Sequence, residues 1–136
     1  MKDDNVFHND KRKTNALSLQ KYAKIAQSRA KAPFSKYPVG AVLLTENSDI
    51  ILGCNVESKA YPNTLCAERV AIFSAIAQGY SKFKSMAIIT NDGATPCGGC
   101  RQIIYEYAQN IKIYIMNQDG IVKELQSSEL LPFPFG

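Results

Sequence analysis

Apolar residues recur at helical spacing in one stretch and as continuous runs in others, and this change divides the first half of the chain into elements. In "LSLQKYAKIAQSRA" (17–30) apolar side chains fall near one side, which predicts a helix that ends before Pro33. The runs "VGAVLLT" (39–45) and "IILGCN" (50–55) are rich in residues that favour strands, and the turn composition "ENSD" separates them. These two runs predict a β-hairpin.

The second half alternates helices with strands. A helix is predicted over "PNTLCAERVAIFSAIAQG" (62–79), with Gly79 as its C-terminal cap. The remaining elements are a strand "SMAIIT" (85–90), a helix "CGGCRQIIYEYAQN" (97–110), a strand "IKIYIMN" (111–117) and a strand "IVKEL" (121–125). This order predicts an α/β fold in which a central mixed five-stranded sheet carries helices on its faces.

The length of 136 residues predicts one domain with a single core. We divide the chain into a charged N-terminal tail (1–15), expected to be flexible, and a single domain (16–136). The chain contains no run of about 18 or more apolar residues, so we predict no membrane partner. The N-terminus lacks the apolar segment of a signal peptide, which predicts a cytoplasmic protein with reduced thiols.

Positive charge is concentrated at the start of the chain. Residues 1–40 hold nine Lys or Arg against three Asp, whereas residues 41–136 hold seven Lys or Arg against nine Asp or Glu. The run "KRK" (11–13) is compatible with nucleic-acid contact or with a solvated tail. Since no basic stripe interleaved with aromatic residues follows, we predict no nucleic-acid partner.

The main candidates for chemistry are the four cysteines, Cys54, Cys66, Cys97 and Cys100. In a reducing compartment, metal binding or catalysis is favoured over a disulfide framework. The only histidine in the sequence is His8, in the tail. A mechanism that needs a core histidine is therefore excluded.

Cys97 and Cys100 form a C-x-x-C directly after Pro96. This spacing lets two thiolates bind one tetrahedral metal ion, but a thioredoxin-like redox pair or two buried core cysteines have it as well. A third thiol, Cys66, at the start of a different helix and two residues before Glu68, favours the metal site. At a helix start, unsatisfied N–H groups and the helix dipole favour the thiolate, which is the metal-binding form.

Three charged residues beside these thiols are candidates for supporting roles. Arg69 and Arg101 directly follow the two cysteine clusters, where they would offset thiolate charge by donating to the sulfurs. The alternative is that both are ordinary exposed helix residues. Glu68 is placed to reach a metal-bound water past the helix end, or else it only complements the helix dipole.

At these residues the sequence resembles the zinc-dependent cytidine deaminase family, in its short, three-cysteine, homotetrameric form. The resemblance runs from about Leu19 to Phe135, through the segments "KAPFSKYPVGAVLL", "GCNVES", "CAERVAIFSAI", "PCGGCRQ" and "ELLPFPF". The broader class carries H-x-E with P-C-x-x-C, and here Cys66 replaces the histidine. The resemblance implies a three-layer α/β/α fold, one Zn²⁺ per subunit, and a homotetramer whose active sites are completed across subunits.

Position by position, the resemblance implies Cys66, Cys97 and Cys100 as zinc ligands and Glu68 as the proton shuttle. The implied substrate-binding residues are Asn55 and Glu57 at the ribose 3′-hydroxyl, the Ala67 backbone at the pyrimidine, Tyr37 in the base pocket, and Tyr61 and Phe135 reaching a neighbouring subunit's site. Tyr37 stands where the family usually has a phenylalanine. Phe133 is a rival of Phe135 for the last of these roles.

The implied reaction is the hydrolytic deamination of cytidine and deoxycytidine to uridine and deoxyuridine, with release of ammonia, in pyrimidine salvage. Zinc-activated water and Glu68 would carry it. The alternatives at this point are a closed structural Cys₄ zinc site with Cys54 as fourth ligand, a blasticidin S deaminase-like enzyme, a nucleic-acid editor and a thiol redox protein. Glu57 argues against the editor, because a 3′-phosphodiester has no hydroxyl proton to donate.

Overall fold

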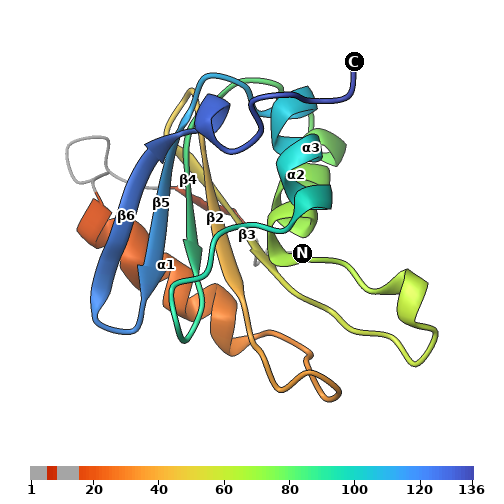
Figure 1. The fold of residues 1–136 in the computed structure, drawn as a ribbon. Coiled ribbons are helices and arrows are strands. Elements are labelled where there is room, and N and C mark those ends of the chain that lie inside the picture. The colour runs from red at the N-terminus through yellow and green to blue at the C-terminus, as the bar shows by residue number, and fades with distance from the viewer. Residues whose placement is uncertain (1–5, 9–15) are drawn as a thin grey trace.

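The predicted hairpin lies at the centre of a mixed sheet. The computed structural model describes residues 6–8 and 16–136, and within them six strands form one sheet with helices on both faces (Figure 1). The strands are β1 (Val6–His8), β2 (Gly40–Thr45), β3 (Asp49–Cys54), β4 (Phe83–Ile89), β5 (Lys112–Asn117) and β6 (Gly120–Gln126). Their order across the sheet is β1-β3-β2-β4-β5-β6. Strands β4 and β5 are parallel, whereas the other neighbouring pairs are antiparallel.

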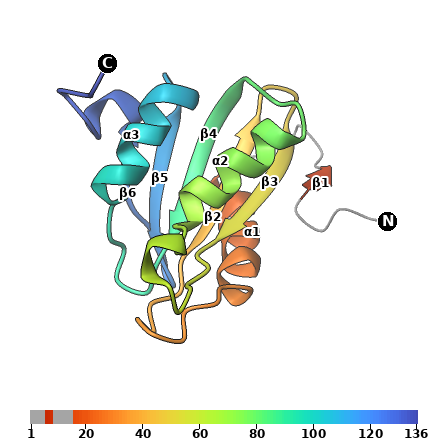
Figure 2. The same cartoon turned by 90° about the vertical axis from the view of Figure 1, so that its right-hand side faces the viewer.

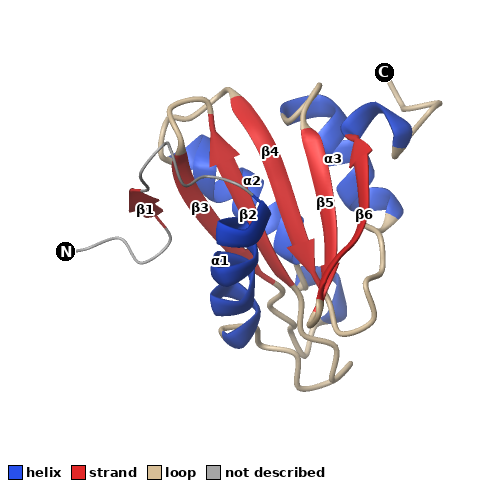
Figure 3. Ribbon diagram, turned by 90° about the vertical axis from the view of Figure 1, so that its left-hand side faces the viewer, coloured by secondary structure: helices blue, strands red, loops and turns tan. Residues whose placement is uncertain are grey.

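Helices cover both faces of this sheet. Helix α1 (Ala16–Ser28) packs on one face, and α2 (Ala67–Ala77) and α3 (Gly98–Tyr107) lie on the other (Figure 2). The opposite view shows α1 in front of the strands (Figure 3). Two short 3₁₀ helices, η2 (Tyr61–Asn63) and η3 (Ser127–Glu129), complete the order. In the part of the chain that the structure describes, no helix has the length and apolar character needed to cross a bilayer.

The sheet topology brings the carboxyl ends of β3 and β4 to one edge of the sheet. Strands β3 and β4 both run antiparallel to β2, and Cys54 and Ile89 both pair with Gly40. The carboxyl ends of β3 and β4 therefore meet at the same edge of the sheet. The connections that lead to α2 and α3 both leave from this edge, so the two helices begin close together.

Burial on both faces explains why the central strands read as continuous apolar runs. All six residues of β2 are buried. One core cluster, which includes Leu43, Ile72 and Ile104, lies beneath α2 and α3. The other, which includes Leu19 and Leu52, lies beneath α1. The predicted three-layer α/β/α architecture is confirmed.

The structure confirms the five predicted strands and adds a sixth. Strand β1 falls inside the predicted tail and pairs antiparallel with β3; residues 1–5 and 9–15 of that tail, with the basic run 11–13, lie outside the described residues. Helix α2 begins at Ala67 and not at Pro62, because η2 precedes it and Cys66 is extended, with φ −73° and ψ 155°. Gly79 follows the helix with φ +94°, as expected of a glycine cap.

Candidate active site

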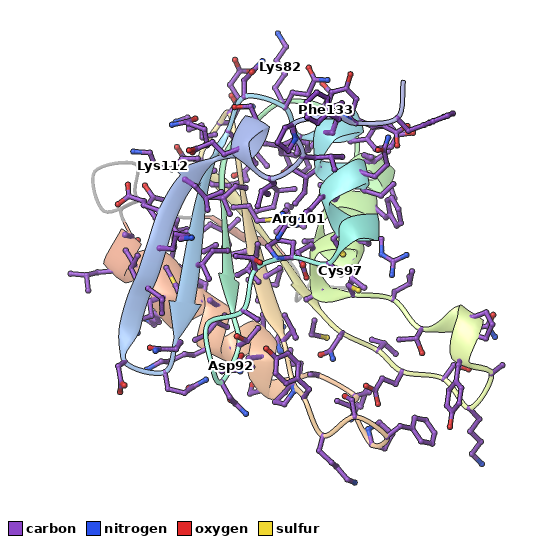
Figure 4. The ribbon with its side chains drawn as sticks, in the orientation of Figure 1. Lys82, Asp92, Cys97, Arg101, Lys112 and Phe133 are labelled. Carbon is purple, nitrogen blue, oxygen red and sulfur yellow. The ribbon has the colours of Figure 1, made fainter. Side chains whose placement is uncertain are left out.

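Three thiols converge where α2 and α3 begin. Cys66 and Cys97 are the N-cap residues of the two helices, and Cys100 lies in the first turn of α3. The three Sγ atoms lie within 4.8 Å of one another, and the Cys66 and Cys97 sulfurs are 3.8 Å apart. Figure 4 labels Cys97 at the end of α3 where that helix starts. The C-x-x-C and the separate cysteine thus form one cluster, as predicted.

The electrostatics of the cluster favour a bound cation. The hydrogen bond from Cys100, aided by Arg69 and Cys97, lowers the pKa of Cys66 to about 5. The same bond to Cys66 raises the pKa of Cys100. Arg69 Nη2 donates to Cys66 Sγ at 3.3 Å, as expected from the sequence. The cluster therefore stabilises a thiolate at Cys66, and the thiolate is the form of cysteine that binds a metal ion.

The donor set fits Zn²⁺, which binds cysteine thiolates in tetrahedral sites. Cys54 does not belong to the cluster. It lines a separate small cavity with Arg29 and Val70, and burial raises the pKa of its thiol. A closed Cys₄ site with Cys54 as the fourth ligand is thus not what the fold builds.

Glu68 places a carboxyl group beside the thiols. It is the second residue of α2, only 4% exposed, and it lines the same cavity as Cys66 and Cys97. Burial raises its pKa to about 7, from the ordinary value of 4.5. A residue that only complemented the helix dipole would gain nothing from this burial, so the position favours a chemical role.

A glycine that sequence reasoning missed sets the position of this helix start. A Cβ atom on Gly53 would lie 2.3 Å from the Ala67 carbonyl oxygen and 2.6 Å from the Ala71 nitrogen. Only a residue without a side chain lets α2 approach β3 this closely. The isolated glycine within a strand-like run was the available signal.

The cluster and Glu68 open on a cavity of about 400 Å³. This volume is within the range of small-molecule sites. Other lining residues that matter for recognition are Tyr37, Asn55, Glu57 and Thr90. The structure therefore brings the predicted metal ligands, the predicted proton shuttle and three of the predicted substrate-binding side chains to one space.

Asn55 and Glu57 also build the wall of the cavity. Asn55 Nδ2 donates to the Tyr37 carbonyl oxygen at 2.8 Å, and its Oδ1 accepts from Val39 N at 2.9 Å. Glu57 Oε1 accepts from Phe34 N at 2.9 Å and from the next backbone nitrogen at 3.1 Å. The two side chains thus hold the loop 31–39 against the cavity.

Main-chain bonds join the loops on this side of the cavity. Lys31 N donates to the Asn55 carbonyl at 2.9 Å, and Glu57 N donates to the Lys31 carbonyl at 2.8 Å. Val56 and Leu65 exchange two backbone bonds of 3.0 and 3.1 Å. The segments around residues 31, 56 and 65 therefore form a small ladder that leads directly to Cys66.

Three predicted aromatic residues lie outside the chain's own cavity lining. Tyr61 is 70% exposed and packs edge-on against Phe34, with ring centroids 5.8 Å apart. Phe135 is 87% exposed and its rival Phe133 is 94% exposed. The backbone of Phe135 bonds to the Gln102 side chain at both its nitrogen and its carbonyl oxygen. The role of these aromatic residues in a neighbouring subunit's site stays a prediction.

Arg101 differs from its prediction. Its side chain donates to three oxygens: the Pro96 carbonyl at 2.7 Å, the Leu130 carbonyl at 2.8 Å and the Thr95 hydroxyl at 2.8 Å. The guanidinium therefore donates to oxygens and not to a thiolate, because the chain before Cys97 wraps around it. Arg101 therefore supports the loop that leads to Cys97. Of the two arginines, only Arg69 donates to a sulfur in the described part of the chain.

The backbone of Ala67 is fully buried between Cys66 and Glu68. Tyr37 lines the cavity, and its hydroxyl donates to Asp92. Asp92 and Thr90 were not singled out from the sequence. The contact of Asp92 with Tyr37 joins segments 55 residues apart, so no local pattern marks it.

Three clustered thiols that could hold a metal ion, beside a cavity and a buried carboxyl group, are typical of one class of protein, the metal-dependent enzymes. Residues 13–116 match the family model described as the cytidine and deoxycytidylate deaminase zinc-binding region. The chain belongs to the cytidine and deoxycytidylate deaminase family. This membership, with the three-thiol cluster, confirms Zn²⁺ as the cofactor and the protein as a zinc-dependent hydrolase.

Individual relatives agree with this membership. The chain is 42% identical to a cytidine deaminase of Sporosarcina psychrophila over 83% of this chain and 85% of that one. It is 38% identical to a cytidine deaminase of Halalkalibacterium halodurans, over 86% and 91%. The crystal structure of cytidine deaminase from Burkholderia pseudomallei superposes with a TM-score of 0.86 at 36% identity, covering 90% of this chain and all of that one.

Proposed function

We propose that the protein catalyses the hydrolytic deamination of cytidine and deoxycytidine, giving uridine or deoxyuridine and ammonia. The observation that carries the proposal is the meeting of the three-thiol cluster, the buried Glu68 and the Asn55–Glu57 pair in one cavity of about 400 Å³. The relatives named cytidine deaminase support the same substrate. A blasticidin S deaminase-like activity has no comparable support.

Cys66, Cys97 and Cys100 would hold one zinc ion per subunit. When bound, zinc supplies Lewis acidity that lowers the pKa of a water molecule and so provides a nucleophile near neutral pH. Arg69 balances part of the thiolate charge through its bond to Cys66. Arg101 keeps Cys97 in place by holding the preceding loop.

Glu68 would move the protons of the reaction. Its carboxylate takes a proton from the attacking water and delivers it to N3 of the cytosine ring, which makes C4 more electrophilic. The water oxygen adds to C4 and gives a tetrahedral adduct. The Glu68 carboxylate then takes the proton of the new C4 hydroxyl and passes it to the amino group, which leaves as ammonia while the C4 carbonyl forms. Because burial raises the pKa of Glu68 to about 7, the group can give and take protons near neutral pH.

Recognition of the sugar would fall to Asn55 and Glu57. Asn55 has two amide hydrogens, one of which goes to the Tyr37 carbonyl, and the carboxylate of Glu57 has a second oxygen. Together they offer a donor and an acceptor to the ribose 3′-hydroxyl. The base would lie between the ring of Tyr37 and the backbone of Ala67.

The working assembly in this proposal is a cytoplasmic homotetramer. Tyr61 and Phe135 are exposed aromatic residues that would reach a neighbouring subunit's cavity, and Phe73 and Ile76 expose further apolar surface on α2. Exposed apolar surface of this kind is typical of interfaces. A reducing cytoplasm keeps the three thiols available for the metal. Light scattering of the zinc-loaded protein tests the assembly.

The decisive experiment follows the loss of cytidine absorbance as cytidine is converted to uridine, with ammonia measured in parallel. Deoxycytidine, free cytosine and blasticidin S serve as comparison substrates. We expect the two nucleosides to be consumed with one ammonia each. Free cytosine and blasticidin S should react far more slowly, because each would leave Asn55 and Glu57 without the hydroxyl that they pair with. Failure to deaminate either nucleoside would overturn the proposal.

A further inference from the structure

We propose that Asp92 is a positioning residue that fixes the Tyr37 ring in the base pocket and thereby sets the affinity for the nucleoside. The inference rests on the proposed function. Tyr37 lies in the loop 31–39 and lines the cavity, whereas Asp92 lies in the loop between β4 and α3 (Figure 4) and, among the described residues, is outside the lining. Asp92 would therefore act on substrate only through Tyr37.

The contact between the two side chains is short and has a charged acceptor. Tyr37 Oη donates to Asp92 Oδ1 at 2.5 Å. This hydrogen bond holds the pKa of Asp92 below its ordinary value, so the acceptor is a carboxylate at neutral pH. Hydrogen bonds to a charged acceptor are stronger than those between neutral groups.

The carboxylate has a fixed position of its own. Thr90 Oγ1 donates to the same Asp92 oxygen at 3.1 Å. That hydroxyl also accepts from Gly93 N at 2.8 Å and from Ala94 N at 2.9 Å. A tight turn that begins at the buried Thr90, directly after β4, thus presents the carboxylate to the phenol.

The other end of Tyr37 is fixed as well. Its carbonyl oxygen accepts from Asn55 Nδ2 at 2.8 Å, and its nitrogen donates to Ser35 Oγ at 3.1 Å. The ring is therefore held at the backbone by one wall of the cavity and at the hydroxyl by the other. Removal of the phenol contact would leave the ring free to turn about its side-chain bonds.

A second set of contacts holds the same two loops without involving Tyr37. Gln27 Nε2 donates to the Pro38 carbonyl at 3.1 Å and to Asn91 Oδ1 at 3.3 Å. Gln118 Nε2 donates to Gln27 Oε1 at 2.7 Å. Because these amide contacts keep the loops joined, loss of the Tyr37–Asp92 bond should release the ring and leave the fold intact.

The test measures kcat and KM for cytidine, zinc content and thermal stability in four variants: Tyr37→Phe, Asp92→Ala, Asp92→Asn and the double variant Tyr37→Phe/Asp92→Ala. We expect Tyr37→Phe and Asp92→Ala each to raise KM by about three- to tenfold. We expect kcat to stay within about twofold of the wild-type value, because the ring contacts the base before and during the reaction alike. The double variant should match the single variants, since all three lose one bond.

Asp92→Asn is the rescuing change. The amide oxygen still accepts from the phenol, so KM should stay within about twofold of the wild-type value. Asp119→Ala in the β5–β6 turn and Tyr107→Phe at the end of α3 are matched controls away from the cavity, and both should leave KM unchanged. A merely structural role for Asp92 would lower thermal stability without this KM pattern.

Two failures can be told apart. A zinc-loaded wild-type protein that does not deaminate cytidine overturns the proposed function, and the inference with it. A wild-type protein that turns over cytidine, with KM unchanged in Asp92→Ala or with additive effects in the double variant, overturns the inference alone.

Discussion

The cavity has a floor and a rim that are built in different ways. The floor consists of Cys66, Glu68, Cys97 and Cys100, which lie at the starts of two helices packed on the sheet; Glu68 and Cys100 are almost fully buried. The rim consists of the loops 31–39 and 55–66, which hydrogen bonds to Asn55 and Glu57 and main-chain bonds hold together. Packing against the sheet thus holds the residues predicted to carry the chemistry. Hydrogen bonds between loops hold the residues predicted to bind the substrate.

The sharpest test of the floor is Glu68→Gln. The amide is nearly isosteric with the carboxyl group but cannot transfer the protons. We therefore expect kcat to fall by about 10²- to 10⁴-fold. Bound zinc should be retained, because Glu68 is not one of the clustered ligands. Steady-state kinetics and metal analysis on the same sample measure both. Near wild-type turnover by the zinc-loaded variant would refute the role of Glu68.

Replacement of a thiol separates the cluster from the cysteine outside it. Loss of a residue that only hydrogen-bonds to a metal ligand weakens metal binding by roughly 10- to 100-fold. Cys97→Ser removes a predicted ligand itself, so we expect it to weaken zinc binding by more than that. Cys54→Ser is the matched control and should retain zinc and most activity, since Cys54 lies apart from the cluster. Competition with a chelator measures the affinities. Equal loss in the two variants would favour the four-cysteine site.

A third test asks whether packing really positions the floor. Gly53→Ala would push its Cβ into the first turn of α2, and overpacking of this kind costs about 1–3 kcal/mol of unfolding free energy. We also expect lower kcat, because Ala67 and its neighbours must shift. Denaturant unfolding and kinetics on the folded protein measure the two effects.

Gly40→Ala provides the control for this test. Its Cβ would meet the Ala23 carbonyl oxygen at 2.4 Å, beneath α1 and on the opposite face of the sheet. The loss of stability should be similar, whereas kcat of the folded protein should change less than in Gly53→Ala. A larger loss of kcat in Gly40→Ala than in Gly53→Ala would show that the packing of α2 against β3 does not set the catalytic geometry.

The smallest effect is expected at the rim. Glu57→Gln keeps the length of the side chain but weakens its acceptor, so we expect KM for cytidine to rise by about tenfold and kcat to change little. The loop 31–39 should stay in place, since the amide oxygen still accepts from Phe34 N. A loss of kcat as large as that of Glu68→Gln would show that Glu57 takes part in the chemical steps and not only in substrate binding.

The same division decides what the sequence could predict. Cys66, Glu68, Cys97 and Cys100 could be located because short motifs put them at helix starts, where local geometry already favours thiolates. Nearly continuous apolar runs identified the central strands. The late start of α2 was missed because the helical pattern continues back to Pro62, whereas η2 and the ladder at Leu65 take those residues.

Contacts across long sequence distances account for the remaining differences. The acceptors of Arg101 include Leu130, which lies 29 residues further on, and Tyr37 meets Asp92 across 55 residues. Neither pairing leaves a periodic or local signal. The fit of Gly53 against α2 likewise depends on how closely a helix approaches a strand, which composition does not encode.

The backbone ladder around residues 31, 56 and 65 has a practical consequence for labelling and immobilisation. Its bonds use main-chain atoms, so the exposed side chains of Lys31 and Val56 can be replaced without removing a hydrogen bond of the ladder. Neither side chain lines the cavity, so a spectroscopic label or a surface attachment placed there would leave Cys66 anchored at the end of the same ladder. The enzyme can thus be tethered beside its active site without a change to the residues that carry its chemistry.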